Sequence, residues 1–145
     1  MSRDVDEAVA AGAHAATGGH APDRTGYFFE PTVLTTSRSD LRIVSDEVFG
    51  PVLVAMPFDS EDALVNAMND TPYGLSASLY TTDLSRVHRL VPRIKAGTVF
   101  VNSPARTDPN LPFGGVKQSG IGREHGSAMI DLYTELKTVV IGYAT

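Results

Sequence analysis

The most constraining feature of the sequence is a glycine-rich stretch at residues 111–124, which reads LPFGGVKQSGIGRE. It places four glycines within the nine positions 114–122. Glycine adopts positive φ angles without a steric penalty and allows another group to approach the backbone closely. The stretch therefore predicts a shaped loop rather than a continuous helix or strand.

The spacing of these glycines does not fit a phosphate-binding loop. Gly115 and Gly120 match the ends of G-x-x-x-x-G, but Ile121 and Gly122 follow where lysine and serine or threonine are required. Gly126 comes one residue too late for the dinucleotide-binding G-x-G-x-x-G fingerprint. From glycine content alone, the stretch is interpreted as a tight crossing between packed elements.

The bulk composition excludes several classes of function. The chain has 145 residues and 42% hydrophobic content, with no apolar run long enough to cross a membrane, which predicts one modest domain. Its net charge of −5 and scattered basic residues argue against nucleic-acid binding. An acidic N-terminus without a signal-peptide core predicts a cytoplasmic protein. The four histidines show no ligand spacing, so no metal site is expected.

Cysteine is absent, which excludes disulfides, thiolate metal sites and a cysteine nucleophile within these 145 residues. Serine catalysis is also disfavoured, because residues 74–78 (GLSAS) approach G-x-S-x-G but end in serine.

Hydrophobic periodicity predicts helices alternating with strands. The expected helical segments are 4–16, 41–48, 61–69, 83–94 and 127–133, and the expected strands are 27–29 continuing to 34, 52–56, 75–79, 98–101 and 138–141. Pro92 is expected to shorten the fourth helical segment. This alternation predicts an α/β fold with a largely parallel sheet flanked by helices.

Three segments resemble the NAD(P)-dependent aldehyde dehydrogenases. Residues 112–124 (PFGGVKQSGIGRE) resemble the family's C-terminal signature, residues 47–52 (EVFGPV) its E-[IV]-F-G-P-V motif, and residues 134–139 (TELKTV) its closing strand. The resemblance implies a single partial domain over residues 1–145, the C-terminal portion of the catalytic domain. It also implies an oligomerisation strand at about 136–143 and the absence of the Rossmann cofactor domain.

Family chemistry uses a cysteine thiolate, a glutamate that activates water, and NAD or NADP as hydride acceptor. These groups precede the matched portion, which corresponds to about the last third of a family member. The isolated chain is therefore expected neither to oxidise aldehydes nor to bind the cofactor. Two interpretations stay open: a piece of an aldehyde dehydrogenase that needs the N-terminal half, or a stand-alone, non-catalytic association module.

The resemblance also implies roles for cofactor and substrate residues. Glu47 and Phe49 match residues that contact the nicotinamide riboside, although from the sequence alone Glu47 is a loop carboxylate. Asn102, Leu111 and Phe113 would line the aldehyde entrance, in a loop otherwise interpreted as exposed. The sequence of residues 108–113 (DPNLPF) resembles that of enzymes that act on aryl-acetaldehydes.

Three charged residues complete the expected site. Glu124 matches a carboxylate that supports a proton relay through water, or it is a first-turn acid favoured by a helix dipole. Arg123 and Glu135 match a charged pair at the subunit interface of a homo-oligomer, or they are solvated surface residues.

Overall fold

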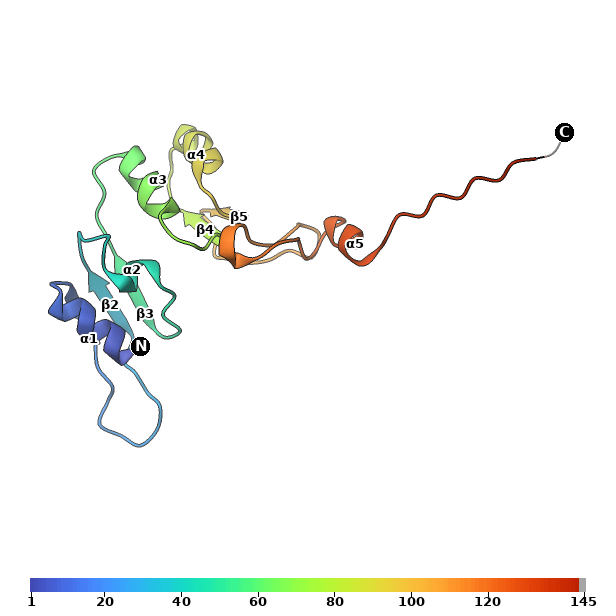
Figure 1. Cartoon of the computed structure of the whole chain (residues 1–145). Helices are drawn as coiled ribbons and strands as arrows, with labels where there is room; N and C mark the ends of the chain where they lie inside the picture. The colour runs from blue at the N-terminus through green and yellow to red at the C-terminus, as the bar shows by residue number, and fades with distance from the viewer. Residues whose placement is uncertain (144–145) are drawn as a thin grey trace. The chain divides into compact units, whose positions relative to one another are not determined.

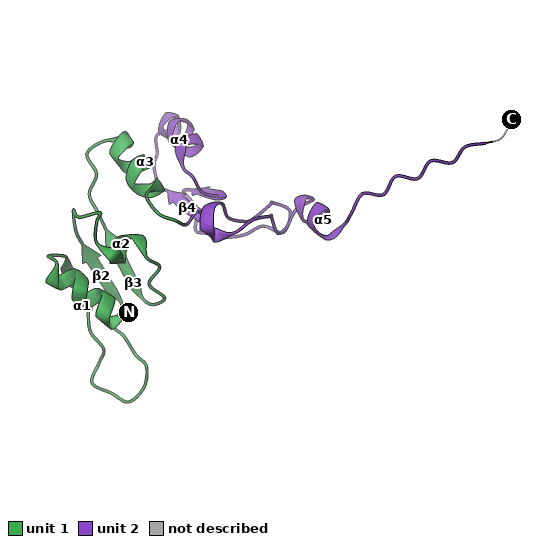
Figure 2. Ribbon diagram, viewed as in Figure 1, with its two compact units in different colours: residues 1–72 green, residues 73–145 purple. Residues whose placement is uncertain are grey.

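The computed structural model describes residues 1–143 of the chain. Its internal contacts divide into two compact units, Met1–Pro72 and Tyr73–Thr145 (Figure 2). From residue 32 onward helices and strands alternate, and each unit contains a parallel strand pair, so the predicted α/β class is confirmed. The expectation of one partial domain over residues 1–145 stays a prediction.

The first unit is built on a three-stranded sheet. Strand β2 (Thr32–Thr35) lies in the centre, antiparallel to β1 (His14–Thr17) and parallel to β3 (Val52–Ala55). Helices α1 (Ser2–Ala10) and α2 (Arg42–Ser45) lie beside this sheet (Figure 1). Apolar residues in and next to these helices form one buried cluster with β2, made of Val5, Ala8, Ala13, Leu34, Leu41 and Ile43.

Two expectations for the first unit were wrong. The helix predicted over 4–16 ends at Ala10, because Gly12 (φ 102°) reverses the chain and residues 14–17 pair with β2. Pairing between distant segments here outweighs the helix propensity of alanine. Residues 27–29 form no strand: Tyr27 and Phe28 are exposed, whereas Phe29 packs against the core of the first unit. Arg24 stacks on Phe28, 3.7 Å from the ring centroid.

Strand β3 appears where it was predicted, but with one face uncovered. Leu53 is 61% exposed, whereas Val52 and Val54 are half-buried against the core. A continuous apolar run of this kind is typical of a strand covered on both faces. The described residues of this chain cover only one of them.

Helix α3 (Glu61–Asn69) has the predicted bounds. Its cap is Ser60, whose hydroxyl accepts a 3.1 Å hydrogen bond from the backbone N–H of Ala63. Such a cap satisfies one of the N–H groups that the first turn leaves without a helical partner.

The second unit contains β4 (Ser76–Leu79) and β5 (Thr98–Val101), a parallel pair in register from Ser76 opposite Thr98. Helix α4 (Leu84–Leu90) connects them, and Pro92 lies in the 3-10 turn that ends it, as predicted. Helix α5 (Ala128–Tyr133) follows the glycine-rich stretch. No helix within residues 1–143 is both long and apolar enough to cross a bilayer.

The strand expected at 138–141, within the oligomerisation strand placed at about 136–143, is not formed among the described residues. Residues 134–143 leave α5 as an extended segment (Figure 1), with Leu136 and Val140 fully or almost fully exposed. A strand is defined by hydrogen bonds to a neighbouring strand, and nothing in the described chain supplies one. Pairing of this segment with another subunit stays a prediction.

Candidate functional site

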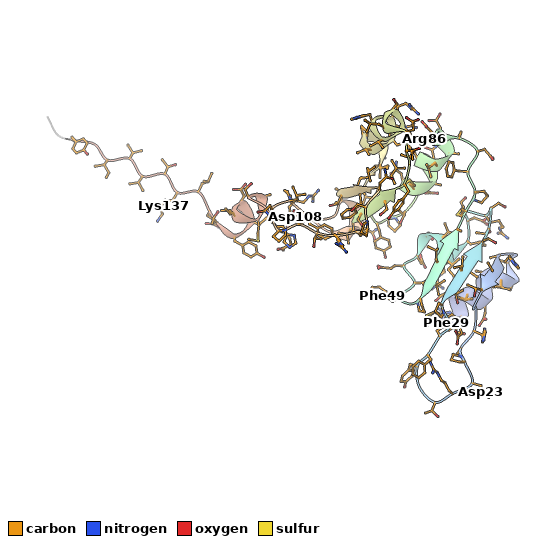
Figure 3. All side chains as sticks on the ribbon, turned by 180° about the vertical axis from the view of Figure 1, so that it is seen from behind. Asp23, Phe29, Phe49, Arg86, Asp108 and Lys137 are labelled. Carbon is orange, nitrogen blue, oxygen red and sulfur yellow. The ribbon has the colours of Figure 1, made fainter. Side chains whose placement is uncertain are left out.

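The EVFGPV motif connects α2 to β3. Val48 is half-buried against the core, while its neighbours Glu47 and Phe49 are exposed, Phe49 by 87% (Figure 3). The carbonyl oxygen of Pro51 accepts a 2.8 Å hydrogen bond from Thr32 N–H, which ties the motif to β2. The alternation therefore presents a carboxylate and an aromatic ring to solvent from an anchored backbone.

Charged side chains hold α2 against α1, immediately before this motif. The Arg42 guanidinium lies 3.2 Å from Asp4 and 2.7 Å from Asp46. A hydrogen bond from the N-terminal ammonium, supplemented by attraction to Arg42, holds the pKa of Asp4 below its ordinary value despite the opposing effect of burial. These contacts fix the start of the segment that carries Glu47.

Asn102 follows β5 and has a left-handed backbone (φ 50°). Its Nδ2 donates a 2.7 Å hydrogen bond to the carbonyl oxygen of Thr81, and its Oδ1 accepts a 2.9 Å hydrogen bond from Thr81 N–H. Both ends of the amide are thus engaged with the segment after β4. A contact between Asn102 and an aldehyde stays a prediction.

The loop from residue 103 to 113 contains no helix or strand, and most of its residues, including Leu111 (63%), are exposed. Phe113 is half-buried and exchanges two backbone hydrogen bonds with Glu124, of 2.8 and 2.7 Å. The structure therefore brings these two predicted site residues together, with the Glu124 side chain exposed. Because α5 begins only at Ala128, a first-turn helix dipole does not account for Glu124.

The glycine-rich stretch packs against the start of both strands of the second unit. The carbonyl oxygen of Gly74 accepts hydrogen bonds from Gly97 N–H (3.0 Å) and Val116 N–H (2.9 Å). A Cβ atom at Gly97 would overlap the carbonyl oxygen of Gly114. The interpretation of this stretch as a tight crossing between packed elements is confirmed.

Arg123 is half-buried within the same stretch. Its Nη1 donates hydrogen bonds to the carbonyl oxygens of Gly115 (2.8 Å) and Gly122 (2.7 Å). Glu135 is exposed, and the two residues form no ion pair in the part of the chain that the structure describes. Arg123 therefore braces its own loop, and an interface role for this pair stays a prediction.

Sequence reasoning missed the partners that hold these loops. The backbone N–H of Thr81 donates a hydrogen bond to the side chain of Asn102, which lies 21 residues later in the chain. The Ser119 hydroxyl accepts a hydrogen bond from the N–H of Gly74, which lies 45 residues earlier. No local pattern marks such distant partners. Over residues 1–143, no group of three or more histidine, aspartate or glutamate side chains could hold a metal ion.

The chain is similar to known proteins over most of its length. The family model of the aldehyde dehydrogenases matches residues 1–139. A phenylacetaldehyde dehydrogenase from Pseudomonas fluorescens is 47% identical over 97% of this chain and 28% of the relative. A betaine aldehyde dehydrogenase from Brucella anthropi is 43% identical over 94% of this chain and 29% of the relative.

Solved structures give the same result. The NAD+ complex of an aldehyde dehydrogenase from Bacillus cereus matches 95% of this chain and 28% of its own, with a TM-score of 0.90 and 42% identity. The chain thus spans less than a third of the length of the relatives that it matches. With the family model matching almost its entire length, the chain belongs to the aldehyde dehydrogenase family.

Proposed function

We propose that this chain forms the C-terminal part of a catalytic unit that oxidises an aldehyde to a carboxylic acid, with NAD or NADP accepting the hydride and water supplying the second oxygen. The observation that carries the proposal is the EVFGPV motif. Val48 anchors it, and Glu47 and Phe49 project from it into solvent. The relative from Bacillus cereus was solved with NAD+.

Glu47 and Phe49 fit the nicotinamide riboside of that cofactor. In the described part of the chain, the Glu47 carboxylate engages no other group, so its oxygens are available to accept hydrogen bonds from ribose hydroxyls. The exposed ring of Phe49 offers an apolar surface beside it. The bound cofactor would supply hydride acceptance, while these residues bind and orient it.

The loop from residue 103 to 113 is proposed to line the approach of the aldehyde, with Leu111 and Phe113 as apolar contacts. Phenylacetaldehyde is the proposed substrate type, since a phenylacetaldehyde dehydrogenase is 47% identical. The exposed carboxylate of Glu124, held beside Phe113 by the backbone bridge, is available for a proton relay through water.

The nucleophile has to come from a polypeptide segment outside these 145 residues, because they contain no cysteine. We propose that the chain works with a segment equivalent to the N-terminal part of its relatives, within a homo-oligomer. A cytosolic location is part of the proposal, because the reaction draws on a soluble nicotinamide cofactor.

Reconstitution tests this function. The chain is co-expressed with the part of the Pseudomonas fluorescens relative that precedes the matched region, and formation of reduced cofactor is followed with phenylacetaldehyde and NAD+. Activity should depend on both polypeptides. Glu47→Gln should raise the KM for NAD+ roughly 10- to 150-fold, the effect of losing hydrogen bonds to a charged group.

The matched control is Asp23→Asn, a change to an exposed loop carboxylate of the same unit (Figure 3). It should leave the KM for NAD+ unchanged. Co-purification of the two polypeptides without any aldehyde oxidation would count against the catalytic proposal and favour a non-catalytic association module.

A further inference from the structure

We propose that Asn102 is a positioning residue, which fixes the direction in which the loop from residue 103 to 113 leaves the β4–β5 sheet. It does so by clamping the backbone of Thr81, not by contacting substrate. The claim that this positioning affects aldehyde oxidation rests on the proposed function. The claim that Asn102 clamps Thr81 does not.

Four hydrogen bonds join the ends of β4 and β5. The two strands are parallel, so their carboxyl ends lie side by side, with Leu79 opposite Val101. Asn102 N–H donates to the carbonyl oxygen of Leu79 (2.9 Å), which carries the strand ladder one residue further. Two more bonds join the Asn102 amide to Thr81, and Tyr80 Oη donates to the carbonyl oxygen of Ser103 (3.1 Å).

Asparagine meets two requirements of this position. The left-handed backbone (φ 50°) is uncommon outside glycine, and asparagine is among the residues that tolerate it best. Its amide also carries one acceptor and two donors on neighbouring atoms, which match the N–H and C=O groups of Thr81. Aspartate has no donor, and glycine has neither group.

The two bonds to Thr81 use one N–H of Nδ2 and one lone pair of Oδ1, and together they fix the orientation of the amide. Turning the amide towards an aldehyde would break both bonds, and the freed backbone groups of Thr81 would lose their partner. The first turn of the loop therefore depends on the clamp. Leu111 lies further along the same loop, whose far end is held separately by the hydrogen bonds between Phe113 and Glu124.

Hydrogen–deuterium exchange of the purified 145-residue chain tests the clamp directly. Asn102→Gly keeps the backbone conformation but removes both side-chain hydrogen bonds, so exchange at Thr81 N–H should accelerate about fivefold or more. Asn110→Gly is the matched control, because the side-chain hydrogen bond of Asn110 goes only to Asp108 in the same loop. It should leave Thr81 unchanged. Exchange at Thr81 that stays at the wild-type rate in Asn102→Gly would overturn the proposal.

Tryptic cleavage after Arg106, an exposed loop residue, gives a second readout. Asn102→Asp keeps the acceptor for Thr81 N–H but sets a carboxylate oxygen against the Thr81 carbonyl. Cleavage should accelerate about fivefold, with circular dichroism unchanged. If the glycine variant fails to fold, this variant decides, and an unchanged cleavage rate rejects the clamp.

In the reconstituted enzyme, Asn102→Asp should raise the KM for phenylacetaldehyde with a smaller change in kcat, because the loop and not the reacting centre moves. A fall in kcat alone would contradict the positioning role. If the wild-type pair of polypeptides shows no activity, the proposed function fails, and the exchange and cleavage results still decide on the clamp.

Discussion

The hydroxyl oxygen of Ser119 accepts a 2.9 Å hydrogen bond from the backbone N–H of Gly74, 45 residues earlier in the chain. The contact is partly buried and lies beside the hydrogen bonds that Gly97 and Val116 donate to the Gly74 carbonyl. It therefore closes the glycine-rich stretch onto the segment that enters β4.

Ser119→Ala should destabilise the chain. It leaves Gly74 N–H without its acceptor, and an unsatisfied group of this kind costs about 1–3 kcal/mol. Urea unfolding followed by circular dichroism measures the change. Ser127→Ala is the control, because Ser127 precedes α5 without making a side-chain cap, and it should shift the stability by less than about 0.5 kcal/mol. Equal effects of the two variants would refute the role of Ser119.

Acid should weaken the first unit through Asp4. Its pKa is lowered in the folded chain, so its carboxylate stabilises the fold above the ordinary value of about 3.9. That contribution disappears as the pH falls through the lowered pKa. Asp4→Asn should be less stable than wild type at neutral pH, with the difference vanishing in acid. Parallel pH dependence of wild type and variant in urea unfolding would contradict this, and Asp23→Asn serves as the control.

The isolated chain should not oxidise aldehydes. Its 145 residues contain no cysteine to attack the carbonyl carbon, and catalysis requires the reacting groups to be held together. Formation of reduced cofactor with phenylacetaldehyde and either NAD or NADP should stay at the rate without enzyme. Sustained turnover that Glu47→Ala abolishes would disprove this prediction.

The isolated chain should also show no measurable affinity for NAD. Glu47 and Phe49 offer contacts to one end of the cofactor only, whereas pyrophosphate is held by a glycine-rich turn and helix N-terminus whose fingerprint the sequence lacks. Titration calorimetry with millimolar cofactor is the measurement. Saturable heat with a micromolar dissociation constant would be the opposite result.

The C-terminal segment should make the chain self-associate. Val139, Val140 and Ile141 are largely exposed, and each large apolar side chain gains about 1.5–3 kcal/mol from burial. Val140→Lys should shift the chain towards monomer in sedimentation velocity, because it places a charge on this segment. Ala105→Lys, in an exposed loop, is the control for added charge. A wild-type chain that sediments as monomer at tens of micromolar would contradict the prediction.

Sequence predicted the elements whose signals are local. Helix α3 has the expected bounds because its cap and its apolar spacing lie within a few residues of one another. The 3-10 turn at Pro92 follows from the missing N–H of proline. The EVFGPV motif likewise indicated Glu47 and Phe49 as candidate residues, since the six residues of the motif are contiguous, and the role of the two stays a prediction.

The wrong predictions and the contacts that were not predicted concern residues that are distant in the sequence. Residues 14–17 have helix-forming neighbours, but pairing with β2 makes them a strand. The clamp of Asn102 on Thr81 and the brace of Arg123 on two carbonyls depend on where loops meet. The sequence indicated candidate side chains for a site, whose roles stay predictions, but not which of them the protein already uses to hold its own loops.

The first unit has a consequence for biosynthesis. Its sheet uses only residues 14–55, so every strand of it is synthesised before β4, which begins at Ser76. At about 5–20 residues per second, residues 73–145 take roughly 4–15 s to follow. Formation of a hairpin and short helices takes microseconds. The first unit therefore has time to fold while the second is still being synthesised, and in its folded form it leaves the apolar side chain of Leu53 exposed.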